Sequence, residues 1–451
     1  MKKLSTRFLM SFVAIMGTAQ AAEARFHPNH LFIKMKEGQA LVKSPLIKSA
    51  KNVIGDIYLV KTNSPDLLSA ELEISEAVEY SQKDFIAEKR EMPKHEVLDR
   101  SALAMKSITS FNFVNFNDPH ASKLWAFNAT AGMNVSEAYD FIGATPLRQV
   151  IVAVADTGVD HNHEDLKDVM WRNEKEIIGN GIDDDRNGYI DDLHGINTLV
   201  RDAQGRATMN TMASHWHGTH VAGTIAASQN NSVGIAGVAS NVKIMAIRVV
   251  PDAADEKDSD IVEGYVYAAK HGARIINCSF GKNLNEGGMI VRDVINEIGH
   301  KYNTLVIASA GNDSQAPFSW HNNDTSPKYP ASFDSANLLV IASTTNTGSM
   351  STFSNIGVRT VDVAAPGSNV YSTTNGNQYA MASGTSMASP NTSGAAAMVL
   401  GKFPNLTAVQ LKAILMSSVT PVAAFKTQVA SGGRVNLKAA LQAAKEIRRS
   451  R

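Results

Sequence analysis

The most constraining feature of this sequence is an alternation of short apolar runs with amphipathic stretches, which begins near residue 134. The apolar runs are almost continuous in branched and small side chains, which is typical of strands buried on both faces of a parallel sheet. They are QVIVAVA (149–155), VKIMAIRVV (242–250), ARIINCSF (273–280), TLVIASA (304–310) and NLLVIAST (337–344). The alternation predicts an α/β fold in which helices cover both faces of a parallel sheet.

Helices are expected between and after these strands. They are residues 134–142, 217–227, 259–272, 289–300, the helix that carries Ser386, 407–418 and 436–447. Thr407 and Gln410 form a capping box at the start of the sixth. Because ligands of open parallel sheets collect beyond the carboxyl ends of the strands, residues just after each strand are the first candidates for a functional site.

The chain before residue 118 has a different texture. Basic residues precede an apolar run at residues 8–16 that is too short to span a bilayer, and Ala-Gln-Ala follows at 19–21, which is typical of a secretory signal. No membrane anchor is therefore expected. The predicted divisions are a signal peptide (1–21), a small α+β domain (22–94), an exposed connection (95–117) and the large α/β domain (118–451).

Bulk composition excludes several classes of partner. The 43 basic and 43 acidic residues balance, and no basic run alternates with aromatic residues, so neither nucleic acid nor an anionic membrane surface is indicated. A single cysteine, Cys278, excludes an intrachain disulfide. Its apolar surroundings predict a buried small side chain rather than a thiol nucleophile. We expect a monomer.

The stretch SGTSMASPNTSG (383–394) joins a turn of small residues to an alanine-rich helix. It places Ser386 at or just inside the first helical turn, with Pro390 still near that turn, where a missing N–H costs little. Unpaired N–H groups and the helix dipole suit a nucleophile whose reaction forms an oxyanion nearby. Ser386 is therefore a candidate nucleophile, although most serines at such places only cap the helix.

Two candidate partners of Ser386 stand at other elements. Asp156 ends the first strand in the tripeptide Asp-Thr-Gly, which also occurs in aspartic proteases, but those need two facing copies and this chain has one. His217 opens a helix, where it can act as a general base with its Nδ1–H held by Asp156. A zinc site at His217 and His220 is the alternative, but no HExxH motif occurs.

Asn312 follows the strand TLVIASA and can donate its amide to an oxyanion from across the site. Alternatively, it only adopts a left-handed turn, as asparagine commonly does after strands. The order Asp156, His217, Ser386 differs from that of chymotrypsin-like enzymes and of α/β-hydrolases. The Gly-x-Ser-x-Gly elbow of the latter is absent, because Ala388 occupies its last position.

Four stretches, VAVADTGVD, HGTHVAGT, ASAGND and GTSMASP, resemble the signatures of the subtilisin-like serine proteases, the subtilases. The resemblance runs from about residue 118 to the end of the chain. It implies Asp156, His217 and Ser386 as a catalytic triad, with Asn312 and the backbone N–H of Ser386 as oxyanion hole. It also implies edges that hold the substrate as an added strand, at Ser279, Phe280, Gly281, Ser309, Ala310 and Gly311.

Residues 22–94 resemble the family's inhibitory propeptide in position, size and strand pattern. That propeptide assists folding and is then removed, so we expect the chain to cut itself between about residues 90 and 118. The propeptide is thus an expected partner of the large domain, besides protein or peptide substrates.

An acidic loop, NGIDDDRNGYIDD (180–192), lies between the first strand and His217. Its spacing matches an EF-hand-like loop, with His194 in the place of the closing glutamate. The pattern resembles calcium-loaded insertions of bacterial subtilases, and the mutual repulsion of five aspartates favours a cation over a solvated loop. The predicted Ca²⁺ ligands are Asp183, Asp185, Asn187, Tyr189 through its carbonyl, and Asp191 or Asp192.

These patterns together predict a calcium-stabilised serine endopeptidase that is made with a signal and a propeptide and is secreted, or retained in a periplasm. A catalytically silent relative that binds peptides or inhibits other proteases is the main alternative. An esterase is a further one, because the same acyl-transfer chemistry cleaves esters.

Overall fold

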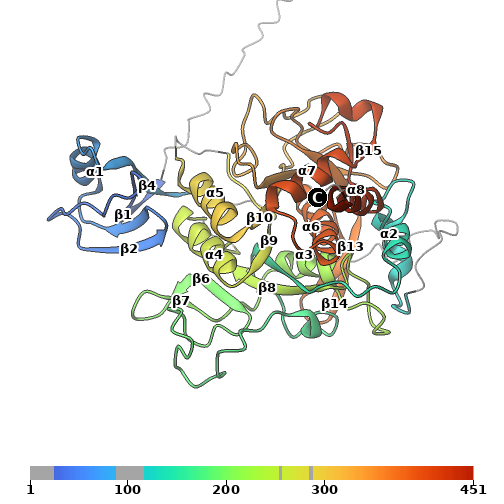
Figure 1. Cartoon of the computed structure of the whole chain (residues 1–451), viewed down its shortest axis with the longest axis horizontal. Helices are drawn as coiled ribbons and strands as arrows, with labels where there is room; N and C mark the ends of the chain where they lie inside the picture. Colours follow the sequence, from blue (N-terminus) through green and yellow to red (C-terminus); the bar gives the residue numbers. More distant parts are fainter. Residues whose placement is uncertain (1–24, 88–115, 253–255, 284–287, 450–451) are drawn as a thin grey trace, which may run out of the picture.

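A computed structural model describes residues 25–87, 116–252, 256–283 and 288–449. The predicted signal peptide, and all of the predicted connection except its last two residues, lie outside this part. Residues 25–87, hereafter the N-terminal module, form an antiparallel sheet of order β2-β3-β1-β4 (Figure 1). Its elements are β1 (Arg25–Met35), β2 (Ser49–Ile54), β3 (Ile57–Lys61), α1 (Pro65–Glu73) and β4 (Val78–Ile86).

The larger unit is built on a ten-stranded sheet of order β15-β16-β12-β11-β10-β9-β5-β8-β6-β7. The central neighbours from β12 to β6 pair in parallel, as predicted. The strands are β5 (Val150–Asp156), β6 (Gly195–Arg201), β7 (Ala207–Thr208), β8 (Val242–Arg248), β9 (Ala273–Cys278), β10 (Leu305–Ser309), β11 (Leu338–Thr344), β12 (Val363–Pro366), β15 (Thr420–Pro421) and β16 (Gly433–Arg434). A separate hairpin joins β13 (Val370–Thr374) to β14 (Gln378–Ala382).

Helices cover both faces of this sheet, and each predicted helix is present (Figure 1). Along β5, Val152 and Val154 belong to one core cluster, while Ala153 and Ala155 belong to the cluster on the opposite face. This two-sided burial explains the continuous apolar runs and confirms the α/β prediction. The helices are α2 (Val135–Ile142), α3 (His217–Ala226), α4 (Asp258–Lys270), α5 (Ile290–Tyr302), α6 (Thr385–Lys402), α7 (Ala408–Ser417) and α8 (Leu437–Arg449).

Two local expectations at helix starts had different outcomes. The capping box of α7 is present: Gln410 N donates to Thr407 Oγ1 at 3.1 Å, and Thr407 N donates to Gln410 Oε1 at 2.9 Å. Pro390, by contrast, is not near the first turn. Because α6 begins at Thr385, Pro390 is its sixth residue and lies inside the helix. The expected place of Ser386 in the first turn is confirmed, but the expectation for Pro390 was wrong, because the first turn ends before residue 390.

The N-terminal module packs beside α4 and α5 (Figure 1). Lys34 Nζ lies 2.8 Å from Asp293 Oδ2 on α5, and Tyr80 donates its hydroxyl to the same oxygen at 2.9 Å. Gln82 Oε1 accepts the backbone N–H of Met289 at 2.7 Å, at the start of α5. The module therefore satisfies donors that the helix itself leaves open.

Asp293 is nearly buried in this interface. Burial raises the pKa of its carboxyl, but the hydrogen bonds from Lys34 and neighbouring donors outweigh burial and hold that pKa below its usual range. The carboxylate is therefore the form that favours docking of the module.

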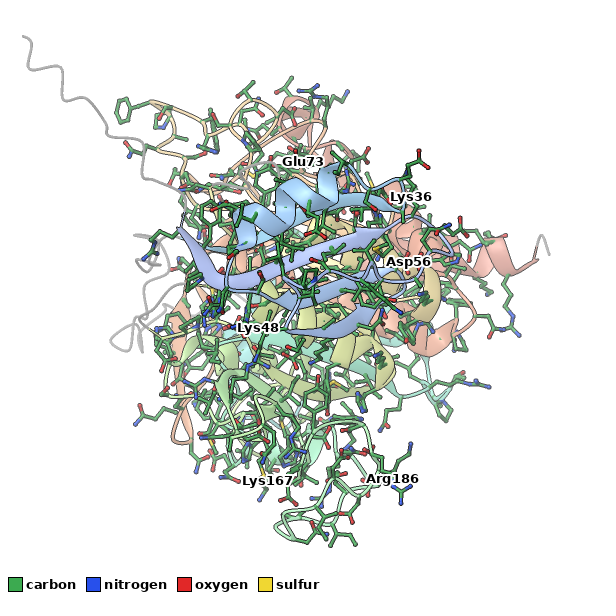
Figure 2. The ribbon with its side chains drawn as sticks, turned by 90° about the vertical axis from the view of Figure 1, so that its left-hand side faces the viewer. Lys36, Lys48, Asp56, Glu73, Lys167 and Arg186 are labelled. Carbon is green, nitrogen blue, oxygen red and sulfur yellow. The ribbon has the colours of Figure 1, made fainter. Side chains whose placement is uncertain are left out.

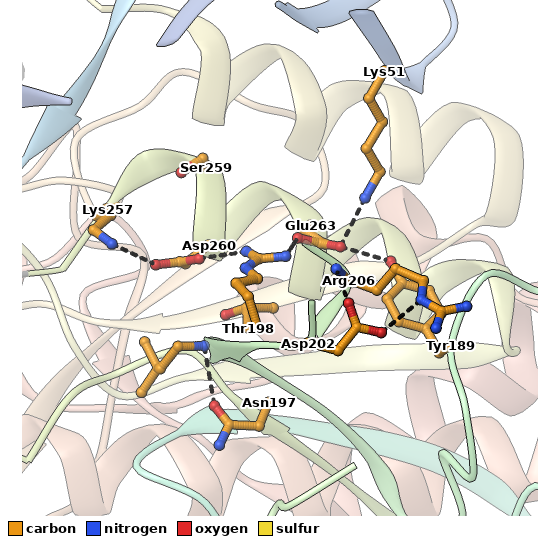
Figure 3. A network of polar contacts seen from close by, with 12 residues as sticks. Lys51, Tyr189, Asn197, Thr198, Asp202, Arg206, Lys257, Ser259, Asp260 and Glu263 are labelled. Atoms are coloured by element: carbon orange, nitrogen blue, oxygen red, sulfur yellow. Dashed lines mark hydrogen bonds and ion pairs between the residues drawn. The ribbon is translucent and has the colours of Figure 1, made fainter. Parts of the chain in front are cut away.

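A second polar contact joins the module to α4 (Figure 3). Glu263 on α4 accepts Lys51 Nζ from β2 at 2.8 Å and the Tyr189 hydroxyl at 3.0 Å. Arg201 on β6 also donates to Glu263. The module, α4 and the acidic loop thus share one carboxylate.

The last described residues of the module pair with the backbone of the large unit. Ile86 forms an antiparallel bridge with Lys257, and Ala87 N donates to Glu256 O at 2.7 Å. Among the helices in the described ranges, none is both long and apolar enough to cross a bilayer.

Candidate active site

Asp156 and His217 meet at the carboxyl edge of the sheet. Asp156 is the last residue of β5, His217 is the first of α3, and both side chains are buried. Asp156 Oδ1 lies 2.7 Å from His217 Nδ1. The sequence prediction that Asp156 holds this histidine through Nδ1 therefore agrees with the geometry.

A glycine allows α3 to approach β5 this closely. A Cβ atom on Gly218 would lie 2.1 Å from Gly158 O and 3.2 Å from Asp156 Cβ. The Gly218 N–H donates to Thr157 Oγ1 at 3.1 Å. The start of α3 is thus fastened to the turn that follows β5, which fixes His217 relative to Asp156.

Ser386 reaches the same edge from α6. Its Oγ donates to Ser279 O at 3.0 Å, one residue beyond the end of β9. Because β9 pairs in parallel with β5, with Cys278 opposite Ala155, Ser279 follows β9 at the edge of the sheet where Asp156 ends β5. The helix α6 also packs against α3, which carries His217. The structure therefore brings all three predicted triad residues to one region.

Asn312 lies against the first turn of α6. Its Oδ1 accepts Thr385 N at 2.8 Å and Thr385 Oγ1 at 2.9 Å. The left-handed residue of this turn is Gly311, with φ of 108°, and Asn312 is not among the residues with positive φ. The alternative explanation of Asn312 as a left-handed turn residue is therefore wrong. With Oδ1 held, Nδ2 is the group of this amide that can donate to an oxyanion.

The structure also bears on the zinc and thiol alternatives. His220 Nε2 lies 3.1 Å from Val370 O and 3.3 Å from Ala380 O, so its ring is tied to the hairpin of β13 and β14. The Nε2 atom of His220 therefore faces backbone carbonyl groups, whereas Nδ1 of His217 faces Asp156. Cys278 is fully buried, and burial raises the pKa of its thiol to about 12, as expected for a structural cysteine.

The predicted substrate edges lie at the ends of β9 and β10. These strands pair in parallel, so Ser279–Gly281 and Ser309–Gly311 leave the sheet side by side. Phe280 is only 4% exposed and belongs to the core cluster beside α4 and α5. Ala310 N donates to Ile341 O at 3.0 Å, and Ala310 O accepts Asn323 Nδ2 at 2.8 Å. Pairing of these stretches with a substrate stays a prediction.

The acidic loop brings Asp183 and Asp185 together with Glu176. One carboxylate oxygen from each lies within 4.8 Å of the others. Sequence analysis missed Glu176 because it precedes the loop, outside the spacing that identified the ligands. Figure 2 shows Arg186, which marks this loop, below the N-terminal module.

The other predicted ligands have different neighbours. Asp191 accepts the N–H groups of Gly179 and Gly181, at 2.8 and 3.1 Å. Asp192 is buried and accepts the Tyr267 hydroxyl at 2.5 Å and Asn187 Nδ2 at 2.8 Å. Asp191 and Asp192 thus stand outside the three-carboxylate group, and their role as ligands stays a prediction.

Comparison with known proteins agrees with this geometry. The Subtilase family model (Peptidase_S8) matches residues 148–437. Thermitase of Thermoactinomyces vulgaris is 33% identical over 291 residues, which are 64% of this chain and 88% of that protein. Subtilisin-like protease 1 of Plasmodium berghei (strain Anka) is 30% identical over 347 residues, which are 74% of this chain. The match spans only 55% of that relative's length.

A solved structure extends the likeness in fold. Fervidolysin from Fervidobacterium pennivorans, described as a keratinolytic enzyme related to subtilisin, aligns over 92% of this chain and 61% of its own. The TM-score is 0.63 and the sequence identity 21%, so this match bears on the fold alone. Because the family model covers more than half of the sequence, this chain belongs to the subtilase family of subtilisin-like serine proteases.

Proposed function

We propose that this chain is a serine endopeptidase with Asp156, His217 and Ser386 as its catalytic triad. The observation that carries the proposal is the 2.7 Å contact between Asp156 Oδ1 and His217 Nδ1, at the sheet edge where α6 brings Ser386. Buried carboxylate, imidazole and hydroxyl groups in this order are the parts of the acyl-transfer mechanism.

In the proposed mechanism, the Ser386 hydroxyl turns its proton from Ser279 O toward His217 Nε2. His217 takes this proton as Ser386 Oγ attacks the peptide carbonyl carbon. His217 then gives that proton to the leaving amine, which breaks the C–N bond and leaves an acyl group on Ser386. A water molecule, deprotonated by His217, hydrolyses this ester. Asp156 keeps Nδ1–H of His217 oriented and stabilises the imidazolium throughout.

The oxyanion of each tetrahedral intermediate would be held by Asn312 Nδ2 and by the backbone N–H of Ser386. The contacts of Asn312 Oδ1 with Thr385 support this assignment, because they anchor the amide at the first turn of the helix that carries the nucleophile. Donors fixed before the reaction stabilise developing charge without reorganisation.

The substrate would be a protein or peptide that lies along Ser279–Gly281. Ala310 and Gly311 would line the substrate with a methyl group and a bare Cα rather than pair with it through the backbone. Gly311 N donates to Thr385 Oγ1 at 3.1 Å, and Gly311 O accepts Asn355 N at 2.9 Å, so these backbone groups are already engaged.

The N-terminal module would act as an inhibitory propeptide, preceded by a signal peptide that directs secretion. The contact of Ala87 with Glu256 supports this role, since it holds the last described residue of the module against the large unit. Its removal would be autocatalytic, by a cut between about residues 90 and 118.

A cation would be held by the carboxylate oxygens of Glu176, Asp183 and Asp185, which are the kind of ligand that Ca²⁺ prefers. Bound there, it would neutralise carboxylates that otherwise repel one another. Asp183 already accepts Gly188 N at 2.9 Å, which orders the loop around the cluster. We propose a stabilising role for the cation, with no part in the chemical step.

A fluorophosphonate probe tests the central proposal. The mature wild-type protein should be labelled, and Ser386→Ala should not. An unlabelled but folded wild type would instead favour a catalytically silent peptide-binding protein. Comparing casein with simple esters separates a peptidase from an esterase.

The same variant tests self-processing. Ser386→Ala, purified from a host without other active proteases, should keep the N-terminal module, as mass spectrometry would reveal. Normal maturation of this variant would refute autocatalytic removal.

A further inference from the structure

A buried polar network lies beside Ser386, where α6 packs against β9. Asn277 comes from β9 and Ser279 follows that strand, while Ser389 and Ser393 come from successive turns of α6. All four side chains are fully buried. Buried polar groups are costly without partners, so the bonds that these residues make define their orientation.

The network meets Ser386 at a carbonyl that the helix does not satisfy. In an α-helix the C=O of residue 386 accepts the N–H of residue 390, but residue 390 is a proline and has none. Ser279 Oγ lies 3.0 Å from Ser386 O and donates to it. A side chain from the sheet thus replaces the helical hydrogen bond at the nucleophile.

Asn277 determines where the Ser279 proton points. Its Nδ2 donates to Ser279 Oγ at 2.9 Å. Its Oδ1 accepts the hydroxyl of Ser393 at 2.9 Å, which favours this orientation of the amide. Ser389 Oγ lies at the same distance from this oxygen and 3.1 Å from Ile307 O. A hydroxyl has one proton, so Ser279 accepts from Asn277 and donates its own proton to Ser386.

Ser279 contacts Ser386 a second time through its backbone. Ser386 Oγ donates to Ser279 O at 3.0 Å, in addition to the bond between Ser279 Oγ and Ser386 O. The two residues therefore exchange two hydrogen bonds, which restrains both the main chain and the side chain of Ser386.

We propose that Ser279, oriented by Asn277, is a positioning residue that holds the nucleophile through the carbonyl left open by Pro390. This inference rests on the proposed role of Ser386. It assigns the Ser279 side chain a function distinct from the predicted substrate edge, which involves the backbone. Without its hydroxyl, the first turn of α6 is free to shift, and Ser386 loses alignment rather than intrinsic reactivity.

The test compares Ser279→Ala with the wild type. We expect a loss of about tenfold in kcat and in the rate of labelling by a fluorophosphonate, with KM changed by less than about twofold, because misalignment raises only the reaction barrier. Thr392→Val is the matched control. Its hydroxyl also bonds a carbonyl within α6, that of Ala388 at 3.1 Å, and its removal should leave both rates unchanged.

A second variant separates positioning from packing. Pro390→Ala supplies an N–H for Ser386 O, so the Ser279 hydroxyl becomes redundant. In the Pro390→Ala background, Ser279→Ala should therefore cost less than about threefold, against about tenfold in the wild type. An equal loss in both backgrounds would overturn the inference, because the carbonyl would then not be the link.

The remaining outcomes are also decisive. If Ser279→Ala does not fold, Ser279→Cys keeps the volume with only a weak donor, and a wild-type labelling rate in this variant would refute the role of the hydroxyl. A loss confined to KM would refute positioning and point to substrate binding. If Ser386→Ala abolishes labelling but Ser279→Ala leaves the labelling rate unchanged, only this inference is overturned. If the Ser386→Ala protein is still labelled, the proposed function is overturned as well.

Discussion

Replacing Gly218 by alanine should disrupt the Asp156–His217 contact without unfolding the protein. Gly218 follows His217 in the first turn of α3, and its Cα faces the turn after β5. The added Cβ would lie 2.1 Å from the backbone oxygen of Gly158. Because this neighbour is backbone, it cannot move away as the end of a flexible side chain would.

The size of the effect follows from that overlap. An ordinary carbon–oxygen contact is about 3.3 Å, so α3 and the turn must separate by roughly 1 Å. The 2.7 Å contact between Asp156 Oδ1 and His217 Nδ1 would then exceed hydrogen-bonding distance. A misplacement of about 1 Å in a catalytic group costs on the order of 10²-fold in rate. Overpacking itself costs about 1–3 kcal/mol, which a protein of ordinary stability tolerates.

The assay is kcat/KM for a peptide substrate, measured beside the Tm of each variant. Gly299→Ala on α5 is the matched control, since its Cβ would lie 2.4 Å from Asn337 Cγ and α5 carries none of the proposed site residues. It should lower Tm and leave kcat/KM within about twofold of the wild type, because it does not touch α3.

Full activity of a folded Gly218→Ala protein would refute the argument that glycine sets the distance between α3 and β5. The argument would also be refuted if, in both Gly218→Ala and Gly299→Ala, kcat/KM fell only in proportion to the fraction of folded protein.

Three further predictions follow from the same structure. Asn312→Ala should lower kcat by about 10²–10³ with little change in KM, and a wild-type kcat would exclude Asn312 from the oxyanion hole. Lys34→Met should loosen the N-terminal module, seen as faster limited proteolysis at residues 25–87. Because the Asp293 pKa is lowered in the docked state, its contribution is present above about pH 4 and is lost as the pH falls through the lowered pKa. Proteolysis that is independent of pH in acid would contradict this role. EGTA should lower the Tm of the wild type and not that of Asp183→Asn combined with Asp185→Asn, and an unchanged wild-type Tm would mean that the loop is only acidic.

Several elements could be predicted because their signal is local. The strands β5, β8, β9, β10 and β11 are buried on both faces and are therefore continuous apolar runs. β2 carries little such signal, since only Val53 and Ile54 of its six residues are buried and the others are exposed. β12, β15 and β16 are only two to four residues long, too short to show a period in the sequence.

The residues of the candidate site also differ in whether a local sequence signal identifies them. Asp156, His217, Asn312 and Ser386 each stand at the end of an element and within a recognisable motif, so the sequence alone identified them. Glu176 carries no such signal, because its place beside Asp183 and Asp185 arises from the folding of the loop.

What the sequence by itself determined is the set of elements and the chemical groups at their ends, since periodicity and capping act over a few residues. Only the tertiary structure decided which of these groups meet. The bond from Ser279 to the carbonyl that Pro390 leaves open joins residues 107 positions apart. No local pattern encodes such a contact, because its partners are brought together by the pairing of β9 in the sheet and by the packing of α6 upon it.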